Sequence, residues 1–316
     1  MRRSTLAAAT VTLVAATALT AASSSFTLAT TADRVPAASA SVTASVSGGT
    51  AVEALPIRSA KAASVVSKPA PITYHNGPVL TAAANVYFVW YGNWGANAAG
   101  QTVLSDFTKA LGGSPYFGIN TTYTDALKVP VTNALTLAGA TNDAYSQGTV
   151  LTDNGVRNVV STAIALNRLP KDANGIYVVL SSADVKESSG FVTRYCGWHA
   201  HALIATTDIK FAFVGDPTTQ GLANCSPQPK LSPNAAPGAD AMVSVLAHEI
   251  EEAVTDPDLN AWYDAAGSEN ADKCAWTYGT TYKTTNGALA NMKLGTRDYL
   301  VQQNWKIAAT QACTLS

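Results

Sequence analysis

Apolar residues along this chain follow two different spacings. Residues 85–91 (NVYFVWY) and 176–180 (IYVVL) are unbroken apolar runs rich in β-branched and aromatic side chains, and residues 201–204 and 209–214 resemble them. Short runs of this kind, bounded by turn residues, predict buried strands. Residues 121–141 alternate more loosely and predict one or two further strands.

Three other segments repeat apolar residues at helical spacing. They cover residues 103–111, about 152–167 and about 240–254, and the chain after the third is rich in loop-forming residues. Strands and helices in this alternating order predict a single α/β or α+β domain, with a twisted mixed sheet packed on helices. The order of strands and helices before the third helix resembles the zincin layout, and by this analogy we expect a zincin-like arrangement.

The first 69 residues carry neither spacing. Arg2 and Arg3 precede an uncharged Ala/Leu/Val/Thr run, which predicts a secretory signal peptide over residues 1–22, with an alternative end at Ala40. Residues 23–69 are mainly Ala, Ser, Thr, Val and Pro, which predicts a disordered linker or a pro-segment. The globular domain is therefore expected over residues 70–316, in a secreted, extracellular protein with no membrane span after signal cleavage.

Charge and cysteine content support this location. Only 13% of the residues are charged and the formal net charge is −1, so there is no basic patch for nucleic acid. The four cysteines, an even number in an exported chain, predict two disulfides among Cys196, Cys225, Cys274 and Cys313. Three pairings are possible, and no C-x-x-C pair is present to favour a four-cysteine zinc site.

The third predicted helix carries the strongest chemical signal. His248 and Glu252 are four residues apart, which places both side chains on one helix face. Glu249 lies next to that face, as in the His-Glu-x-x-His zinc peptidases, with Glu in place of the second His. Because carboxylate oxygens also bind zinc, we predict a zinc cofactor held by His248 and Glu252, with Glu249 as general base.

A third zinc ligand must come from elsewhere. Asp258 follows His248 by ten residues, the spacing of the extended metzincin pattern, although the glycine of that pattern is missing. Glu269 and Asp272 precede Cys274, and a disulfide there would hold their loop over the helix. We favour Glu269 slightly, and Asp258 and Asp272 remain alternatives.

Two further interpretations concern the same residues. Acidic side chains often form a solvated helix face, although five carboxylates between 249 and 258 would repel one another without a cation. Calcium would also neutralise them, but His is a poor calcium ligand. His199 and His201 alternate on a predicted strand and point the same way, either as auxiliary groups near the metal or as a structural pair.

Five ordered segments resemble the EXORDIUM family, also called phosphate-induced protein 1. They are YHNGPVL at 74–80, VYFVWYGNW at 86–94, CGWH at 196–199, VTDP at 254–257 and the tail from Cys274 to Cys313. The resemblance covers residues 71–316 and implies a secreted protein. Its plant members are linked to cell expansion and growth responses in the wall, with no settled biochemical activity. The His-Glu-x-x-Glu sequence leads us to expect a bacterial- or fungal-type member.

Three functions follow from these patterns. The first is a secreted zinc-dependent, peptidase-like hydrolase acting on an unknown extracellular substrate, either a peptide or a cell-wall polymer. The second is a non-enzymatic extracellular protein of cell-wall or growth signalling, with the acidic helix as plain surface. The third and weakest is a carbohydrate-binding module that uses exposed Trp94, Trp198 and Trp262.

Overall fold

A six-stranded mixed sheet lies at the centre of the computed structural model, which describes residues 52–58 and 70–316. The strand order is β1-β8-β9-β6-β3-β4, and β4, β3, β6 and β9 run parallel. β8 runs antiparallel to β9, and β1 runs antiparallel to β8. The bounds are β1 (Glu53–Pro56), β3 (Ala84–Tyr91), β4 (Leu135–Asp143), β6 (Gly175–Ser181), β8 (Tyr195–Ile204) and β9 (Thr207–Gly215).

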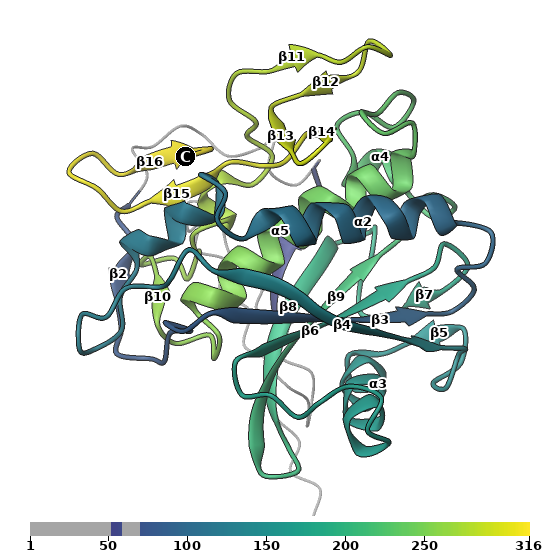
Figure 1. The fold of residues 1–316 in the computed structure, drawn as a ribbon, viewed down its shortest axis with the longest axis horizontal. Coiled ribbons are helices and arrows are strands. Elements are labelled where there is room, and N and C mark those ends of the chain that lie inside the picture. Colours follow the sequence, from purple (N-terminus) through teal and green to yellow (C-terminus); the bar gives the residue numbers. More distant parts are fainter. Residues whose placement is uncertain (1–51, 59–69) are drawn as a thin grey trace, which may run out of the picture. The chain divides into compact units, whose positions relative to one another are not determined.

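Helices cover both faces of this sheet, as Figure 1 shows. α2 (Ala98–Leu111) and α5 (Pro237–Thr255) lie on one face, and α3 (Asp153–Ala165) lies on the other. Strands buried on both faces need apolar residues at every position, which explains the unbroken runs of β3 and β6. The predicted mixed sheet packed on helices is therefore confirmed.

The chain after α5 forms short strand pairs instead of long elements. Asn304 and Gln302 from this part hydrogen-bond to Glu251 and Ser244 of α5, so it closes the helix face that the sheet leaves open. Its elements are β10 (Trp262–Tyr263), η2 (Asp272–Cys274), β11 (Tyr282–Lys283), β12 (Leu289–Ala290), β13 (Met292–Leu294), β14 (Arg297–Tyr299), β15 (Asn304–Lys306) and β16 (Ala312–Thr314). The remaining elements are β2 (Thr73–Tyr74), η1 (Phe117–Thr122), β5 (Val150–Leu151), β7 (Lys186–Glu187) and α4 (Leu222–Cys225).

Both predicted disulfides are present, in the sequential pairing. Cys196–Cys225 joins β8 to α4, and Cys274–Cys313 joins η2 to β16. Among the residues that the structure describes, no helix has the length and apolar character needed to cross a membrane.

The N-terminal segment departs from its prediction at one place. Residues 53–56, inside the segment expected to be disordered linker or pro-segment, form strand β1 at the edge of the sheet. The apolar run AVEALPI supplies three strand residues that are fully or almost fully buried, which offsets the ordering entropy. The predicted signal peptide and the rest of 23–69, apart from 52–58, lie outside the described residues.

Candidate metal centre

α5 is buried on every side, including the face with the predicted metal ligands. His248, Glu249 and Glu252 have no exposed surface, because the sheet covers one face of the helix and the C-terminal strand pairs cover the other. The interpretation of these carboxylates as a solvated helix face is therefore wrong. Burial of so many ionisable groups is costly unless each is paired.

A glycine on β8 lets the helix approach the sheet closely. A Cβ atom on Gly197 would lie 2.4 Å from Val245 Cγ1 and 3.0 Å from Glu249 Oε1. His199 follows two residues later on the same strand face, so its ring points at the same stretch of α5. The close contact brings an imidazole from the sheet to the carboxylates of the helix.

Glu252 lies at the centre of the cluster, with its two oxygens facing different partners. Oε1 is 3.0 Å from His248 Nε2 and accepts a hydrogen bond from the backbone N–H of Asp272 at 3.0 Å. Oε2 is 3.5 Å from His199 Nδ1. The carboxylate therefore belongs to two possible ligand sets, His199–Glu252–Glu269 and His248–Glu252–Asp272.

The loop after α5 supplies one carboxylate to each set. Glu269 Oε1 lies 3.7 Å from His199 Nε2, and Asp272 Oδ1 lies 3.5 Å from His248 Nε2. Asn270 donates from its side-chain amide to the Glu251 carbonyl at 3.2 Å, which ties this loop to the helix. From the sequence we expected Glu269 to bind the metal together with His248. In the structure Glu269 lies beside His199, and Asp272 lies beside His248.

Nine buried polar atoms in this cluster make no hydrogen bond. Buried polar groups in folded proteins almost always have a partner, and a group without one commonly marks a missing ion or water. The atoms are both ring nitrogens of His199 and of His248, both side-chain oxygens of Glu249, and one oxygen each of Glu53, Glu252 and Glu269. Their types are nitrogen and oxygen donors that suit a divalent cation such as zinc.

Mutual charge and burial shift the pKa values of the cluster strongly. Burial raises the pKa of Glu249 to about 7, although His199 and His248 oppose the shift. Burial would also raise the pKa of Glu252, but the two histidines lower it to about 2. Burial alone would lower the pKa of His199, and the carboxylates of Glu249 and Glu252 instead raise it to about 10. The histidines and the carboxylate of Glu252 thus favour one another's charged forms.

Glu53 belongs to the cluster and was missed from the sequence. It lies opposite His199 in the β1–β8 pair and is almost fully buried, and burial together with Asp272 raises its pKa to about 11. One signal was available: Glu53 is the only acidic residue between Asp33 and Asp106, and it interrupts an apolar run. A single carboxylate in such a run indicates a buried function, not a solvated linker.

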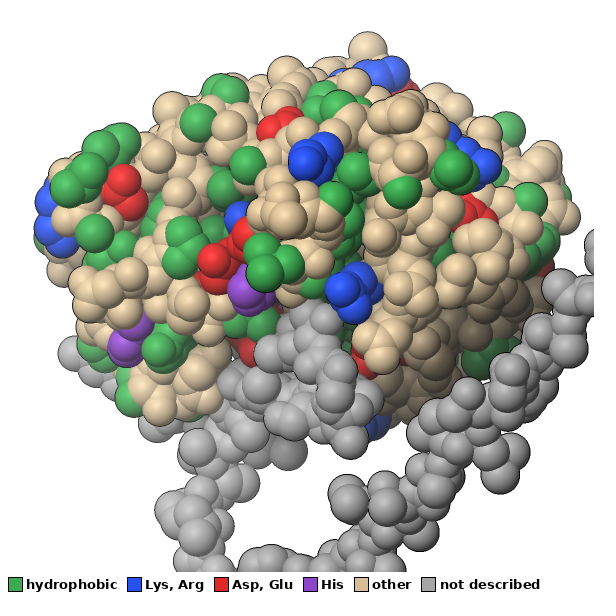
Figure 2. All heavy atoms as spheres, turned by 90° about the horizontal axis from the view of Figure 1, so that it is seen from below, with side chains coloured by type: hydrophobic (Ala, Val, Ile, Leu, Met, Phe, Trp, Pro, Cys, Tyr) green, Lys and Arg blue, Asp and Glu red, His purple; other side chains and the backbone are tan. Residues whose placement is uncertain are grey.

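Asp258 and His201 lie in a second group, apart from the buried cluster. His201 Nδ1 is 2.9 Å from Asp208 Oδ1 and 3.6 Å from Asp258 Oδ1, and Lys210 Nζ is 2.9 Å from Asp208 Oδ2. The side chains of His201, Asp208 and Asp258 are partly exposed, and the buried Lys210 supplies a cation. Figure 2 shows histidine beside acidic and basic side chains on one surface, whereas His199 and His248 are buried and contribute nothing to any surface.

The other acidic residues of the helix region have partners inside the protein. Glu251 Oε2 accepts a hydrogen bond from Asn304 at 2.7 Å. The Asp256 carboxylate accepts hydrogen bonds from the backbone N–H groups of the three residues from Asn260 to Trp262, and these bonds fix the turn after α5. Of the five carboxylates between residues 249 and 258, only Glu249 and Glu252 therefore lie in the candidate metal cluster.

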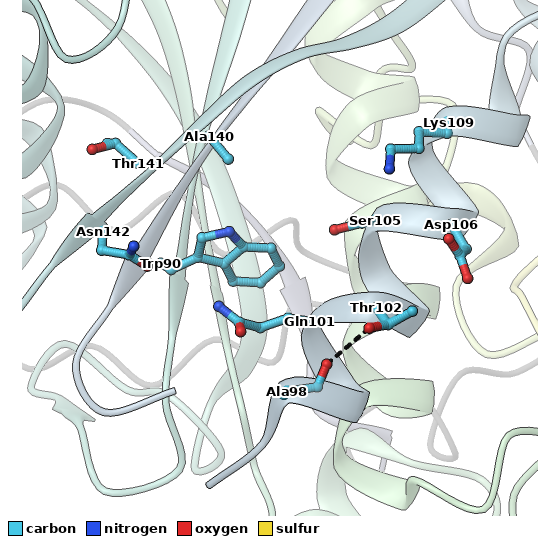
Figure 3. Close-up of a pocket in the computed structure, with 10 residues that line it drawn as sticks. All are labelled: Trp90, Ala98, Gln101, Thr102, Ser105, Asp106, Lys109, Ala140, Thr141 and Asn142. Atoms are coloured by element: carbon cyan, nitrogen blue, oxygen red, sulfur yellow. Dashed lines mark hydrogen bonds between the residues drawn. The ribbon is translucent and has the colours of Figure 1, made fainter. Parts of the chain in front are cut away.

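The tryptophans proposed for carbohydrate binding are not exposed. Trp94, Trp198 and Trp262 are 4%, 0% and 8% exposed, so none offers a face to a sugar ring, and that hypothesis is wrong for these residues. A cavity of about 500 Å³ lies elsewhere, between α2 and strands β3 and β4 (Figure 3). It is lined by Trp90, Ala98, Gln101, Thr102, Ser105, Asp106, Lys109, Ala140, Thr141 and Asn142, none of which belongs to the buried cluster.

Comparisons with known proteins identify relatives over most of the chain. A family model described as the phosphate-induced protein 1 conserved region matches residues 72–315. The chain is 30% identical to Protein EXORDIUM-like 5 of Arabidopsis thaliana over 275 residues, which cover 74% of this chain and 75% of that protein. It is also 30% identical to Protein EXORDIUM-like 3 of the same plant over 272 residues, covering 74% and 80%. No solved structure matches, so the zincin-like layout stays a prediction.

Proposed function

The chain belongs to the phosphate-induced protein 1 family, and from this premise we propose that it is a secreted, zinc-dependent hydrolase whose metal lies at the buried cluster around Glu252. The two disulfides support an oxidising, extracellular location. One observation carries the metal proposal: nine buried nitrogen and oxygen atoms converge there without a hydrogen bond.

The two ligand sets share Glu252, which is therefore the residue on which metal binding depends. His248 and Asp272 would bind on the side of Oε1, and His199 and Glu269 on the side of Oε2. Each set combines one imidazole with two carboxylates, and both groups are ligand types that bind zinc. A bound zinc ion supplies Lewis acidity and makes a nearby water more acidic.

Glu249 is the group best placed to move a proton. Its carboxylate lies 3.5 Å from His199 Nδ1 and has no hydrogen bond, so it is available to a water at the ion. A general base works best when its pKa is close to the working pH, and burial raises the pKa of Glu249 to about 7. Glu249 would accept the proton of the attacking water and become neutral. If His248 and Asp272 hold the ion, His199 would stabilise the negative charge that develops on the substrate oxygen.

Metal analysis of the purified protein tests the first half of this proposal. We expect stoichiometric zinc in the wild type and none in Glu252→Ala, measured by elemental mass spectrometry after dialysis. His248→Ala and His199→Ala identify the ligand set, because only the variant that removes a ligand lowers the zinc content. A wild-type protein that takes up no zinc after incubation with the ion contradicts the proposal.

Hydrolysis is tested separately, with Glu249→Gln. This variant keeps the size and shape of the side chain but removes the carboxylate that accepts a proton, so it should retain zinc and lose cleavage of labelled casein. Zinc-dependent cleavage that survives in Glu249→Gln contradicts the role of this residue.

A second function is favoured by the complete burial of the cluster. A metal without solvent access would stabilise a non-enzymatic extracellular protein in the way that structural zinc sites stabilise small domains. Stoichiometric zinc with no hydrolysis, together with a lower melting temperature after chelation, would favour this second function.

A further inference from the structure

β1 is the feature that closes the metal centre. The strand contributes only residues 53–56, and it pairs with the outer edge of β8 along Tyr195–His199. In Figure 1 it is the short purple segment. On its other side β1 has no strand among the described residues, so it forms the edge of the sheet. Without β1, β8 would itself present an unpaired strand edge beside His199.

The register directs a side chain of β1 into the cluster. Glu53 is the partner of His199, and Leu55 is the partner of Gly197, the glycine that touches α5. Directly opposed residues of two paired strands point to the same face of the sheet. Glu53 therefore points toward α5, where its carboxylate interacts with Asp272 and with the charge of Glu252.

Two hydrogen bonds outside the strand pairing hold β1 in place. The backbone N–H of Ile57 donates to the Arg194 carbonyl at 3.0 Å, and Trp276 Nε1 donates to the Pro56 carbonyl at 2.9 Å. The side chains of Glu53, Ala54 and Leu55 are buried as well. Backbone pairing with alternate side chains in pockets is also how extended peptides add to the edge of a sheet.

We propose that β1 occupies the position in which an extended peptide substrate pairs with β8, and that the full chain is a self-inhibited form. The proposal rests on the proposed function and names its substrate class, an unfolded or extended peptide. A peptide in place of β1 would lay its backbone past His199 and beside Glu249 and Glu252. It would also lack the carboxylate that Glu53 inserts among the metal-binding groups.

The experiment releases β1 from an intact, folded protein. Residues 60–66 are replaced in the full chain by the recognition sequence of a site-specific protease, and the protein is cut after folding. The fragment that carries β1 is separated by size-exclusion chromatography, with zinc content measured before and after. Cleavage of fluorescein-labelled casein and its binding by fluorescence anisotropy are then compared in cut and uncut protein.

We expect release of β1 to increase casein cleavage at least tenfold, and a synthetic peptide of residues 51–58 to inhibit the cut protein by raising its KM. An unchanged cleavage rate with zinc retained, or no inhibition by the peptide, overturns the inference. If zinc is bound but casein is not cleaved by cut or uncut protein, the hydrolase proposal fails and the binding measurement tests the strand position. Casein that binds only after release of β1, and that competes with the synthetic peptide, supports the strand position. If the cut protein neither cleaves nor binds casein, both the hydrolase proposal and the proposed strand position are overturned.

Two single variants of β1 serve as matched controls. Leu55→Ala removes apolar contacts of the strand and leaves Glu53 in place, whereas Glu53→Gln keeps the strand and replaces the carboxyl group by an amide. Leu55→Ala should raise the cleavage rate of the uncut protein several-fold and speed fragment release after cutting. Glu53→Gln should accelerate zinc exchange with a chelator several-fold. A fragment that stays bound after cutting even in Leu55→Ala identifies β1 as a permanent strand and overturns the inference.

Discussion

Two groups of histidines and carboxylates lie along strand β8, and they differ in burial and in hydrogen bonding. His199 reaches into the cluster around Glu252, where both its ring nitrogens lack a hydrogen bond. His201, two residues further along β8, hydrogen-bonds to Asp208 at 2.9 Å. The side chain of His201 is 34% exposed, whereas that of His199 is 0% exposed.

The difference shows what distinguishes a candidate metal centre from a surface ion-pair network. In the partly exposed group Lys210 lies 2.9 Å from Asp208 and 3.7 Å from Asp258, so a lysine balances both acids. In the buried cluster the side chains of His199 and His248 lie within 4 Å of the carboxylates of Glu249, Glu252 and Glu269, and both histidines are fully buried. Unsatisfied buried atoms are therefore a better guide than the residue types alone.

The largest loss of stability and of zinc binding should come from removing the carboxylate of Glu252, which both ligand sets share. Glu252→Ala leaves two buried histidines without their main counter-charge, and losing one partner of a buried ion pair typically costs about 3–5 kcal/mol. We expect a loss of this size in the free energy of urea unfolding, together with loss of zinc. Asp258→Asn in the exposed group is the control and should keep both. Equal effects of the two variants would erase the distinction between the groups.

Removing the Cys274–Cys313 disulfide should lower the stability of the protein and weaken zinc binding at the buried cluster, while the group around Asp208 is left intact. The bond closes a loop over a sequence separation of 39 residues, and on the chain-entropy model it stabilises the protein by about 4 kcal/mol. The double variant Cys274→Ser/Cys313→Ser also loosens the loop that carries Glu269 and Asp272. We expect a lower melting temperature and weaker zinc binding in titration calorimetry. Zinc affinity that survives unchanged would show that this loop contributes no ligand.

Gly197→Ala tests how closely the sheet must approach the helix. The new methyl group would overlap Val245 Cγ1 and press on Glu249, and overpacking of this kind costs about 1–3 kcal/mol. We expect that destabilisation in thermal unfolding, together with a several-fold loss of zinc affinity. Ala202→Gly on the exposed half of β8 should leave zinc affinity unchanged. A fully stable Gly197→Ala with normal zinc binding would contradict the packing described here.

The smallest effect concerns the exposed group and pH. Burial opposes ionisation of Asp208, but Lys210 and His201 lower its pKa to about 2. Since the folded pKa lies below the unfolded value of about 3.9, the ionised carboxylate stabilises the fold above pH 4 and loses this effect as pH falls toward 2. Asp208→Asn should cost less than about 1 kcal/mol at pH 7 and nothing near pH 2, measured by urea unfolding. A pH-independent difference would contradict it.

The sequence predicted the long elements because their patterns are local. β3, β6, β9 and α3 lie close to their expected positions, and α5 extends a few residues beyond its expected ends. β8 begins at Tyr195, six residues before its expected start. α2 begins at Ala98, earlier than expected, because Asn97 caps its first turn by accepting the Gly100 N–H. The disulfide pairing was one of three possibilities, since spacing alone cannot say which cysteines meet in space.

The site was only partly predictable for a similar reason. The pair His248 and Glu252 is read from one helix, and both do lie on one face in contact. His199, Glu269 and Asp272 approach through packing of distant segments, so their partners could not be assigned from spacing. Glu53 was missed because a four-residue strand in an Ser/Ala-rich segment has too weak a local pattern.

Burial of α5 on all sides has a consequence for the order of assembly during folding. The face that carries His248 and Glu252 is closed by Asp272, and Glu251 is satisfied by Asn304, both of which are synthesised after the helix. Until those residues arrive, the carboxylates of α5 remain in water, where they keep their hydration. We therefore expect α5 to be fully buried only after the last part of the chain has packed against it, so that an ion bound before then would be enclosed.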